Sequence, residues 1–134
     1  MQLNISTDYA IRLVLFLATV NGTTGGAEIS QSMGIPRGQF GEISRLLRQG
    51  GVIDTQRGAN GGYHLAKKPE DITLGEIINI METTTRINRC LEEEGFCSRH
   101  ATDSCPVRRF YCHVQQWLDE AFEEKTIASL LKDD

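Results

Sequence analysis

The 134-residue chain, 40% hydrophobic and 24% charged, is long enough to bury one core and has the composition of a globular domain. Its net charge of −4 divides unevenly, because residues 1–68 carry seven Lys or Arg against four Asp or Glu, whereas residues 69–134 carry seven against fourteen. The most apolar segment, residues 9–20, contains Arg12, is shorter than the roughly 20 residues of a membrane span and lacks the flanks of a signal peptide, so we expect a cytoplasmic protein with no membrane partner.

Hydrophobic periodicity predicts a helical first half that ends in a β-hairpin. We expect a helix over residues 8–20 capped by Ser6 or Thr7, then helices over residues 27–33 and 37–49 separated by the stop signal Gly34–Pro36. Residues 52–56 and 62–67 have the pattern of two short strands around the tip Arg57–Gly61, which holds the turn-forming pair Asn60–Gly61. Thr73 and Glu76 form a capping-box pattern at the start of a further helix over residues 73–82.

This order of elements is typical of a winged helix-turn-helix. The helix over residues 37–49 buries an apolar face and leaves polar side chains on the other, where they can donate to and accept from base edges in a major groove. The predicted DNA-binding residues are Arg37, Gln39, Glu42 and Arg45 on that helix and Arg57, Asn60 and Gly61 in the wing. The alternative is that these are ordinary solvated side chains of a small helical domain.

The second half of the chain changes character. Residues 83–104 have no helical or strand periodicity, and from Pro106 a long helix follows, with a short tail helix over residues 126–131. Apolar residues recur every three or four positions on the long helix, as in a helix–helix seam: Val107, Phe110, Tyr111, Val114, Trp117, Leu118, Ala121 and Phe122. We therefore predict a mainly α fold with a hairpin wing, divided into a DNA-binding domain (1–82), a cysteine-bearing loop (83–104) and a dimerisation helix with its tail (105–134).

All four cysteines lie in the second half, with the spacing C-x6-C-x7-C-x6-C from Cys90 through Cys97 and Cys105 to Cys112. A structural zinc site normally uses tighter pairs, and seven helical residues would separate Cys105 from Cys112 by roughly 10 Å. An iron–sulfur cluster tolerates wider, loop-borne cysteines and is favoured. A thiol redox switch, a zinc site and inert packed cysteines remain alternatives, and Cys112 by itself is typical of a small packed hydrophobe.

Four features together resemble one family of regulators. "MQLNISTDYAIR" at the start, "RGANGGYHL" in the wing, "ITLGEII" after it and spaced cysteines before a long helix are similar to the Rrf-type winged-helix regulators, the group with NsrR, IscR and RirA. The resemblance covers nearly the whole chain. It implies a homodimer that binds palindromic promoter DNA and holds one cluster per subunit through the residues matching Cys90, Cys97 and Cys105.

Details within the group point to the NsrR type. The IscR type takes a fourth ligand from a histidine at the position of Arg108, so that ligand is absent here. In the NsrR type the fourth ligand is an aspartate of the other subunit, which matches Asp8; Cys112 or His113 is the alternative, because this chain has longer cysteine spacings and one extra cysteine. The cofactor expected from the resemblance is a 4Fe–4S cluster in preference to a 2Fe–2S cluster.

The function predicted is that of an iron–sulfur-containing repressor that senses nitric oxide, redox state or iron and cluster supply. The alternatives are a cluster-free, thiol-based redox-sensing repressor and a zinc-stabilised DNA-binding protein. An enzyme is not expected, because the sequence has neither a C-x-x-C pair nor an acid–base constellation.

Overall fold

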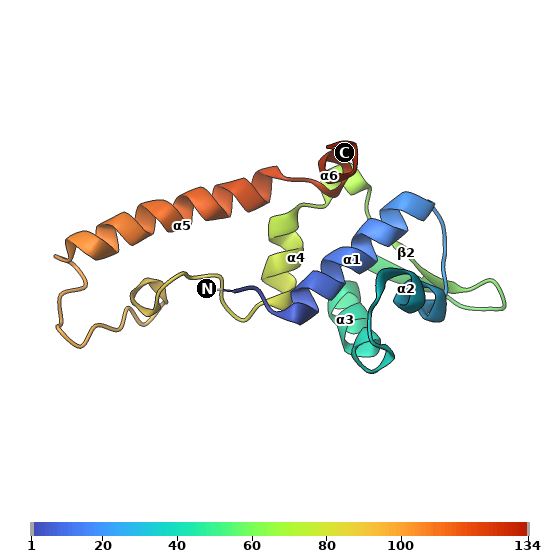
Figure 1. The fold of residues 1–134 in the computed structure, drawn as a ribbon, viewed down its shortest axis with the longest axis horizontal. Coiled ribbons are helices and arrows are strands. Elements are labelled where there is room, and N and C mark those ends of the chain that lie inside the picture. The colour runs from blue at the N-terminus through green and yellow to red at the C-terminus, as the bar shows by residue number, and fades with distance from the viewer. Residues whose placement is uncertain (1, 134) are drawn as a thin grey trace.

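A computed structural model describes residues 2–133 and shows a bundle of short helices from which a hairpin and a long helix extend on opposite sides (Figure 1). The helical prediction is confirmed, as is the antiparallel hairpin. The elements in chain order are α1 (Ile5–Val20), α2 (Gly26–Met33), α3 (Arg37–Gln49), β1 (Ile53–Gln56), β2 (Gly62–Leu65), the 3-10 turn η1 (Pro69–Asp71), α4 (Leu74–Met81), the 3-10 turn η2 (Arg89–Leu91), α5 (Pro106–Glu124) and α6 (Ile127–Lys132).

The core forms where the first helices meet. α1 contributes Ala10, Leu13, Val14 and Leu17, whose spacing puts them on one helical face, and they pack with buried residues of α2, α3 and β1. Ile127 of α6 folds back into the same core, although it lies over a hundred residues away in the sequence from α1. Full burial of each such side chain contributes about 1.5–3 kcal/mol, so the core holds the helix-turn-helix elements in a fixed arrangement.

The start of α1 differs from the prediction. The helix begins at Ile5 with Asn4 as its N-cap, and neither Ser6 nor Thr7 caps it. Instead, Glu82 at the end of α4 accepts hydrogen bonds from the Asn4 backbone N–H (2.6 Å), Asn4 Nδ2 (2.6 Å) and Thr7 Oγ1 (2.9 Å). A carboxylate at this position satisfies unpaired donors and opposes the positive end of the helix dipole. The residues around the start of α1 could not predict this contact because Glu82 is remote in the sequence.

The hairpin has the predicted tip but a different turn. β1 and β2 pair from Ile53↔Leu65 to Gln56↔Gly62, which leaves residues 57–61 as the tip. Gly61 N–H donates to Gly58 O (3.0 Å), so Ala59 and Asn60 are the central residues of the turn, and Asn60–Gly61 is not the central pair. Gly58 has a φ of 111°, which favours glycine.

The capping prediction for α4 is confirmed in part. Thr73 Oγ1 accepts from the Glu76 N–H (3.0 Å), but the Glu76 side chain pairs with Lys67 of the segment after β2. This ion pair links the segment after β2 to α4, the helix that the cysteine segment follows.

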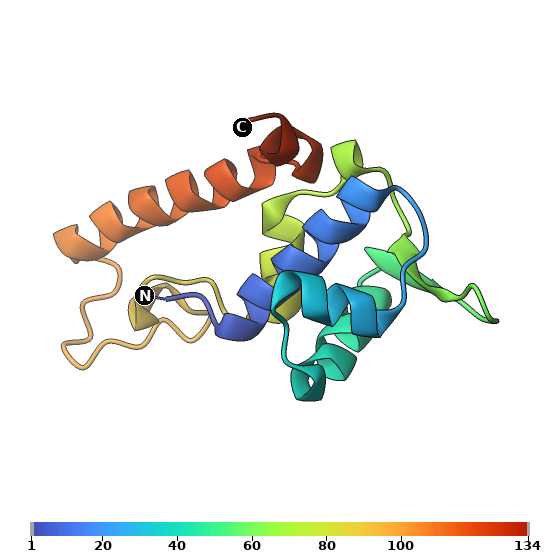
Figure 2. The same cartoon turned by 45° about the vertical axis from the view of Figure 1, so that its right-hand side comes forward.

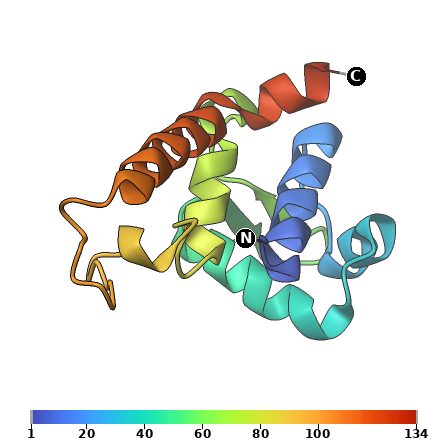
Figure 3. The same ribbon diagram turned by 60° about the vertical axis from the view of Figure 1, so that its left-hand side comes forward.

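α5 leaves the helical body and is fastened to it at its C-terminal end. There Thr73 bridges Thr126, and Gly75 lies so close to Glu123 that a Cβ on Gly75 would be 2.3 Å from the Glu123 carboxylate. Figures 2 and 3 show the other end of α5 extending beside the cysteine segment, away from α2 and α3. No helix within residues 2–133 is long and apolar enough to cross a membrane.

Candidate functional site

The polar face of α3 is fully available to a partner molecule. α2 ends at Gly34, whose φ of 65° reverses the chain, and buried Ile35 anchors the turn before Pro36 caps α3. Phe40, Ile43 and Leu47 of α3 point into the core. The four predicted DNA-contacting side chains of α3 are all exposed: Arg37, Gln39, Glu42 and Arg45.

Glu42 and Arg45 form an ion pair on this exposed face of α3. Arg45 Nε donates to Glu42 Oε2 (3.0 Å), and Arg45 Nη2 donates to the other oxygen, which makes a bidentate pair one turn apart. Hydrogen bonding from Arg45 lowers the pKa of Glu42, and the same bond raises the pKa of Arg45. The pair therefore presents a charged acceptor and a charged donor, side by side, to any molecule that lies along α3.

The wing is oriented by contacts that the sequence did not reveal. Thr24 and Tyr63 exchange backbone hydrogen bonds (Thr24 N–H to Tyr63 O, 3.0 Å; Tyr63 N–H to Thr24 O, 2.8 Å), and the Tyr63 ring meets the Phe40 ring edge-on with centroids 5.3 Å apart. These contacts connect β2 to the loop before α2 and to α3. Arg57 and Asn60 at the tip are exposed, and the backbone at Gly61 is so close to Gln56 O that a Cβ would lie 2.2 Å from it.

The four cysteines are unpaired and partly exposed. Cys90 lies in η2, where Asn88 Nδ2 is 3.2 Å from its sulfur; Cys97 lies in the following loop; Cys105 is the N-cap residue of α5; and Cys112 lies two turns into α5. Among residues 2–133 of a single chain, no three Cys, His, Asp or Glu side chains form a group able to hold a metal ion. Cys90, Cys97 and Cys105, the predicted cysteine ligands, thus precede α5 in the sequence. Within one subunit they do not form a site for a single metal ion.

Cys97 has a distinct environment. Hydrogen bonding from the backbone at Ala101, and then at Arg99, lowers the pKa of the Cys97 thiol, and the Arg99 charge lowers it further. The chain turns tightly there, with His100 N–H donating to Cys97 O (3.0 Å) and His100 at a φ of 54°. This loop favours a thiolate at Cys97.

Asp8 lies on the exposed side of α1. Its carboxylate pairs with Arg12 Nη2 (2.7 Å), and Arg12 Nη1 also donates to Met33 O (3.0 Å) at the end of α2. Half of the Asp8 side chain is accessible, so a second molecule can reach it.

A polar contact that hydrophobic periodicity does not predict fastens the cysteine segment to α5. Within α5 the residue that is buried is Gln115 (4% exposed), whereas the apolar Val107, Phe110 and Trp117 are 52%, 63% and 67% exposed. Three side chains of α5 bind residues 85–90 through hydrogen bonds: Gln115 binds the backbone of Thr85 and Ile87, Asp119 accepts from Arg86, and Arg108 donates to Cys90 O. Arg108, Gln115 and Asp119 lie on one helical face, and this spacing was the signal available in the sequence.

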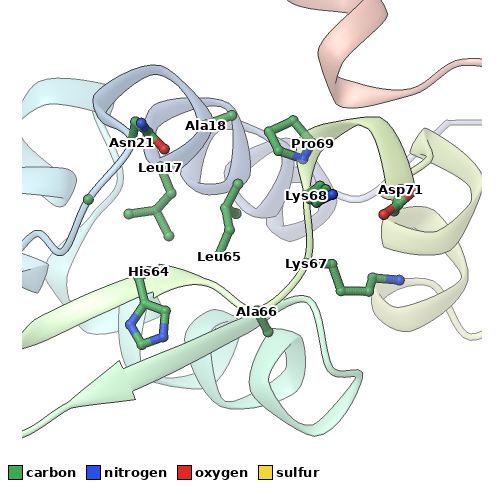
Figure 4. A pocket seen from close by; sticks show the side chains of 11 residues that line it. Leu17, Ala18, Asn21, His64, Leu65, Ala66, Lys67, Lys68, Pro69 and Asp71 are labelled. Carbon is green, nitrogen blue, oxygen red and sulfur yellow. The ribbon is translucent and has the colours of Figure 1, made fainter.

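The molecule also has a cleft of about 600 Å³ between the end of α1 and the strand β2 (Figure 4). Leu17, Leu65 and Pro69 form its apolar side, with Lys68 and Asp71 at its edge. None of the residues predicted to bind DNA or a metal lines this cleft.

Comparison with known proteins places these features in one context. A model of the Rrf2 family, described as an iron-dependent transcriptional regulator, matches residues 3–133. The fold is similar to that of CymR (YrzC), the global cysteine regulator of B. subtilis, with a TM-score of 0.83 and 23% identity over 100% of this chain and 98% of that one. It is also similar to T. potens IscR (TM-score 0.77, 24% identity, 99% and 88% coverage) and to the oxidised form of Staphylococcus aureus CymR (0.74, 20%, 97% and 95%).

Proposed function

Because the chain belongs to the Rrf2 family of transcriptional regulators, we propose that it is a homodimeric repressor that binds palindromic promoter DNA and senses nitric oxide, redox state or iron and cluster supply through an iron–sulfur cluster. The observation that carries the proposal is the position of the cysteine segment. It continues the chain from the end of α4 and is hydrogen-bonded to α5, so it connects the DNA-binding domain with the helix proposed to pair the subunits.

α3 would enter the major groove and the hairpin tip would reach a phosphate or the minor groove. Arg45 and Glu42 offer a donor fork and an acceptor to base edges, while Arg37 and Arg57 offer positive charge to phosphates. A single subunit makes few such contacts. Pairing two subunits doubles them and gives the symmetry that a palindromic operator requires.

The donor set suits a cluster. Cys90, Cys97 and Cys105 are unpaired and partly exposed, and the lowered pKa of Cys97 favours the thiolate form that binds iron. These three residues would hold the cluster, which when bound supplies iron that reacts with nitric oxide and oxidants. Asp8 of the partner subunit is the proposed fourth ligand, with Cys112 as the alternative, and a 4Fe–4S cluster is favoured over a 2Fe–2S cluster.

The second candidate is a cluster-free, thiol-based repressor. The lowered pKa of Cys97 favours it, since thiolates are the form that oxidants attack, and so does the similarity in fold to the oxidised form of Staphylococcus aureus CymR. In that case DNA binding would respond to peroxide without any dependence on iron.

Anaerobic purification followed by iron, sulfide and zinc analysis separates the candidates. We expect brown protein whose visible absorbance is lost in Cys90→Ala, Cys97→Ala and Cys105→Ala, kept in Cys112→Ala and weakened in Asp8→Ala. Colourless anaerobic protein with stoichiometric zinc would contradict the cluster and support the zinc-stabilised alternative. Colourless, metal-free protein that loses DNA binding on treatment with peroxide would support the thiol-based one.

A further inference from the structure

We propose that Gln115 and Arg108 are positioning residues for Cys90: they set the alignment of residues 84–91 along α5 and so place Cys90 beside the start of that helix, where Cys105 is the N-cap. The proposal rests on the proposed function, in which both cysteines bind the same group. It adds the two side chains that bring them together.

The first attachment is at Gln115. Ile87 N–H donates to Gln115 Oε1 (2.7 Å), and Gln115 Nε2 donates to Thr85 O (3.0 Å) and to Asp119 Oδ1 (2.9 Å). Arg86 reinforces it by donating to both oxygens of Asp119 (3.1 and 3.0 Å). Because Gln115 is buried, all of these partners are needed, and an unsatisfied amide there would cost about 1–3 kcal/mol.

The second attachment is at Arg108. Its Nε donates to Cys90 O (3.1 Å), and its side chain lines a cleft of about 270 Å³ together with Leu91, Cys112 and Gln115. A guanidinium stays protonated in proteins and does not bind iron. Arg108 therefore acts on the site through the backbone of Cys90.

The order of the two attachments sets the direction of the segment. Ile87 binds Gln115, whereas Cys90, three residues later in the chain, binds Arg108, which lies seven residues earlier on α5. Seven helical residues span about 10 Å, which three residues with an extended Asn88 (φ −149°, ψ 152°) and the long Arg108 side chain can bridge. The segment thus runs antiparallel to α5, and a slip by one helical turn would break both attachments at once.

Both side chains bind main-chain groups of the segment, so their attachments do not depend on the cysteine side chains. Changing a cysteine would remove a ligand and leave the alignment intact. Changing Gln115 or Arg108 would leave every ligand present and alter the separation between Cys90 and Cys105. This difference allows the two roles to be distinguished.

The test uses the full chain, reduced and free of metal, under anaerobic conditions. Gln115→Ala and Arg108→Lys are compared with Gln116→Ala and Arg109→Lys, which change the same residue types at exposed neighbouring positions. Hydrogen exchange of the Ile87 amide is measured by NMR, and the yield of Cys90–Cys105 cross-link with the short dithiol reagent dibromobimane is measured by mass spectrometry. Circular dichroism confirms that each variant is folded, and Arg108→Lys on the half-exposed end of α5 provides the test if Gln115→Ala does not fold.

We expect Ile87 to exchange about tenfold faster in Gln115→Ala, as loss of a hydrogen bond of ordinary strength predicts, and the cross-link yield to fall severalfold in both variants but in neither control. Cross-linking and exchange that match the controls would overturn the proposal, as would absence of a Cys90–Cys105 cross-link in the unmodified protein. Because no metal is present, the result does not depend on whether the protein binds a cluster, which the iron, sulfide and zinc analysis of anaerobic protein tests separately.

Discussion

The four cysteines look equivalent in the sequence, but each has its own surroundings in the folded chain. Cys90 is attached to α5 through its carbonyl, Cys97 is faced by backbone donors, Cys105 caps a helix, and Cys112 shares a cleft with Arg108 and Gln115. The surroundings of Cys97 come from residues close in the sequence, whereas Cys90 is held by Arg108, 18 residues away.

In metal-free protein we expect Cys97 to be alkylated at a lower pH in the folded chain than in the urea-unfolded chain. Hydrogen bonding from the backbone at Ala101 and Arg99 lowers the pKa of the Cys97 thiol, so in the folded chain its thiolate persists as pH falls below the ordinary range of a thiol. Peptide mass spectrometry after brief exposure to iodoacetamide across a pH series gives the Cys97 midpoint with and without urea. Equal midpoints in the two states would contradict the expectation.

Glu82 is a second residue whose importance depends on distant partners. Glu82→Ala removes the acceptor for Asn4 and Thr7 at the start of α1, so we expect the free energy of unfolding to fall by about 1–3 kcal/mol. Urea denaturation measures it. Glu124→Ala removes an exposed carboxylate at the end of α5 and should change stability by less than about 0.5 kcal/mol; equal effects of the two would show that Glu82 has no special role.

At the scale of elements, α5 has two faces that differ in their contacts. One face, with Arg108, Gln115 and Asp119, binds the cysteine segment of its own chain. The other exposes Val107, Phe110 and Trp117, which follow a helical spacing and form an apolar stripe of the kind that a second helix covers. A helix with this division can pair subunits while holding a sensing segment.

Trp117→Glu should therefore convert the protein to a monomer without unfolding it. Trp117 is 67% exposed in one subunit, so its loss costs the isolated fold little, whereas loss of a central aromatic anchor weakens pairing by at least about 2 kcal/mol. Sedimentation across a concentration series reports the state. Gln116→Glu places the same charge one residue away and should leave the dimer intact; a dimeric Trp117→Glu variant would move the interface elsewhere.

Over the whole molecule, the two halves of the chain differ in charge and in position. The half that carries α3 and the hairpin has an excess of Lys and Arg, and the half that carries α5 and α6 is acidic. The hairpin extends from the body on the side opposite α5, and α3 lies in the body away from the far end of α5 (Figure 1), so DNA and a second subunit can be bound together.

We expect Arg57→Ala and Arg45→Ala to weaken DNA binding in different ways. A phosphate contact by Arg57 would be lost equally on all sequences and reduce the salt dependence by about one unit of slope, whereas a base contact by Arg45 would cost about 1–3 kcal/mol at one operator position. Fluorescence anisotropy at several salt concentrations, on an operator selected from random DNA and on its single-base variants, measures both. Lys132→Ala removes one positive charge on α6 and should change neither the salt dependence nor the preference for a base. An Arg57→Ala protein with an unchanged salt slope would exclude the phosphate contact.

Local patterns predicted what depends on near neighbours. The spans of α2 and α3, the tip at residues 57–61 and the Thr73 cap follow from periodicity, turn residues and a short-range hydrogen bond. The start of α1 and the burial of Gln115 did not follow, because Glu82 and residues 85–87 come from elsewhere in the chain. The positions of the four cysteines relative to one another could not be predicted either, because spacing along the chain does not specify how a segment without periodicity folds.

Gly75 of α4 lies close against Glu123, so α5 is held to the helical body at its C-terminal end, and this contact can act as a pivot for the helix. The helix has 19 residues and is about 28 Å long, so a rotation of about 10° at the pivot moves its far end by about 5 Å. That far end carries Cys105 and lies beside the cysteine segment. A change of angle small enough to leave the core undisturbed can thus move the surroundings of the cysteines by several ångströms.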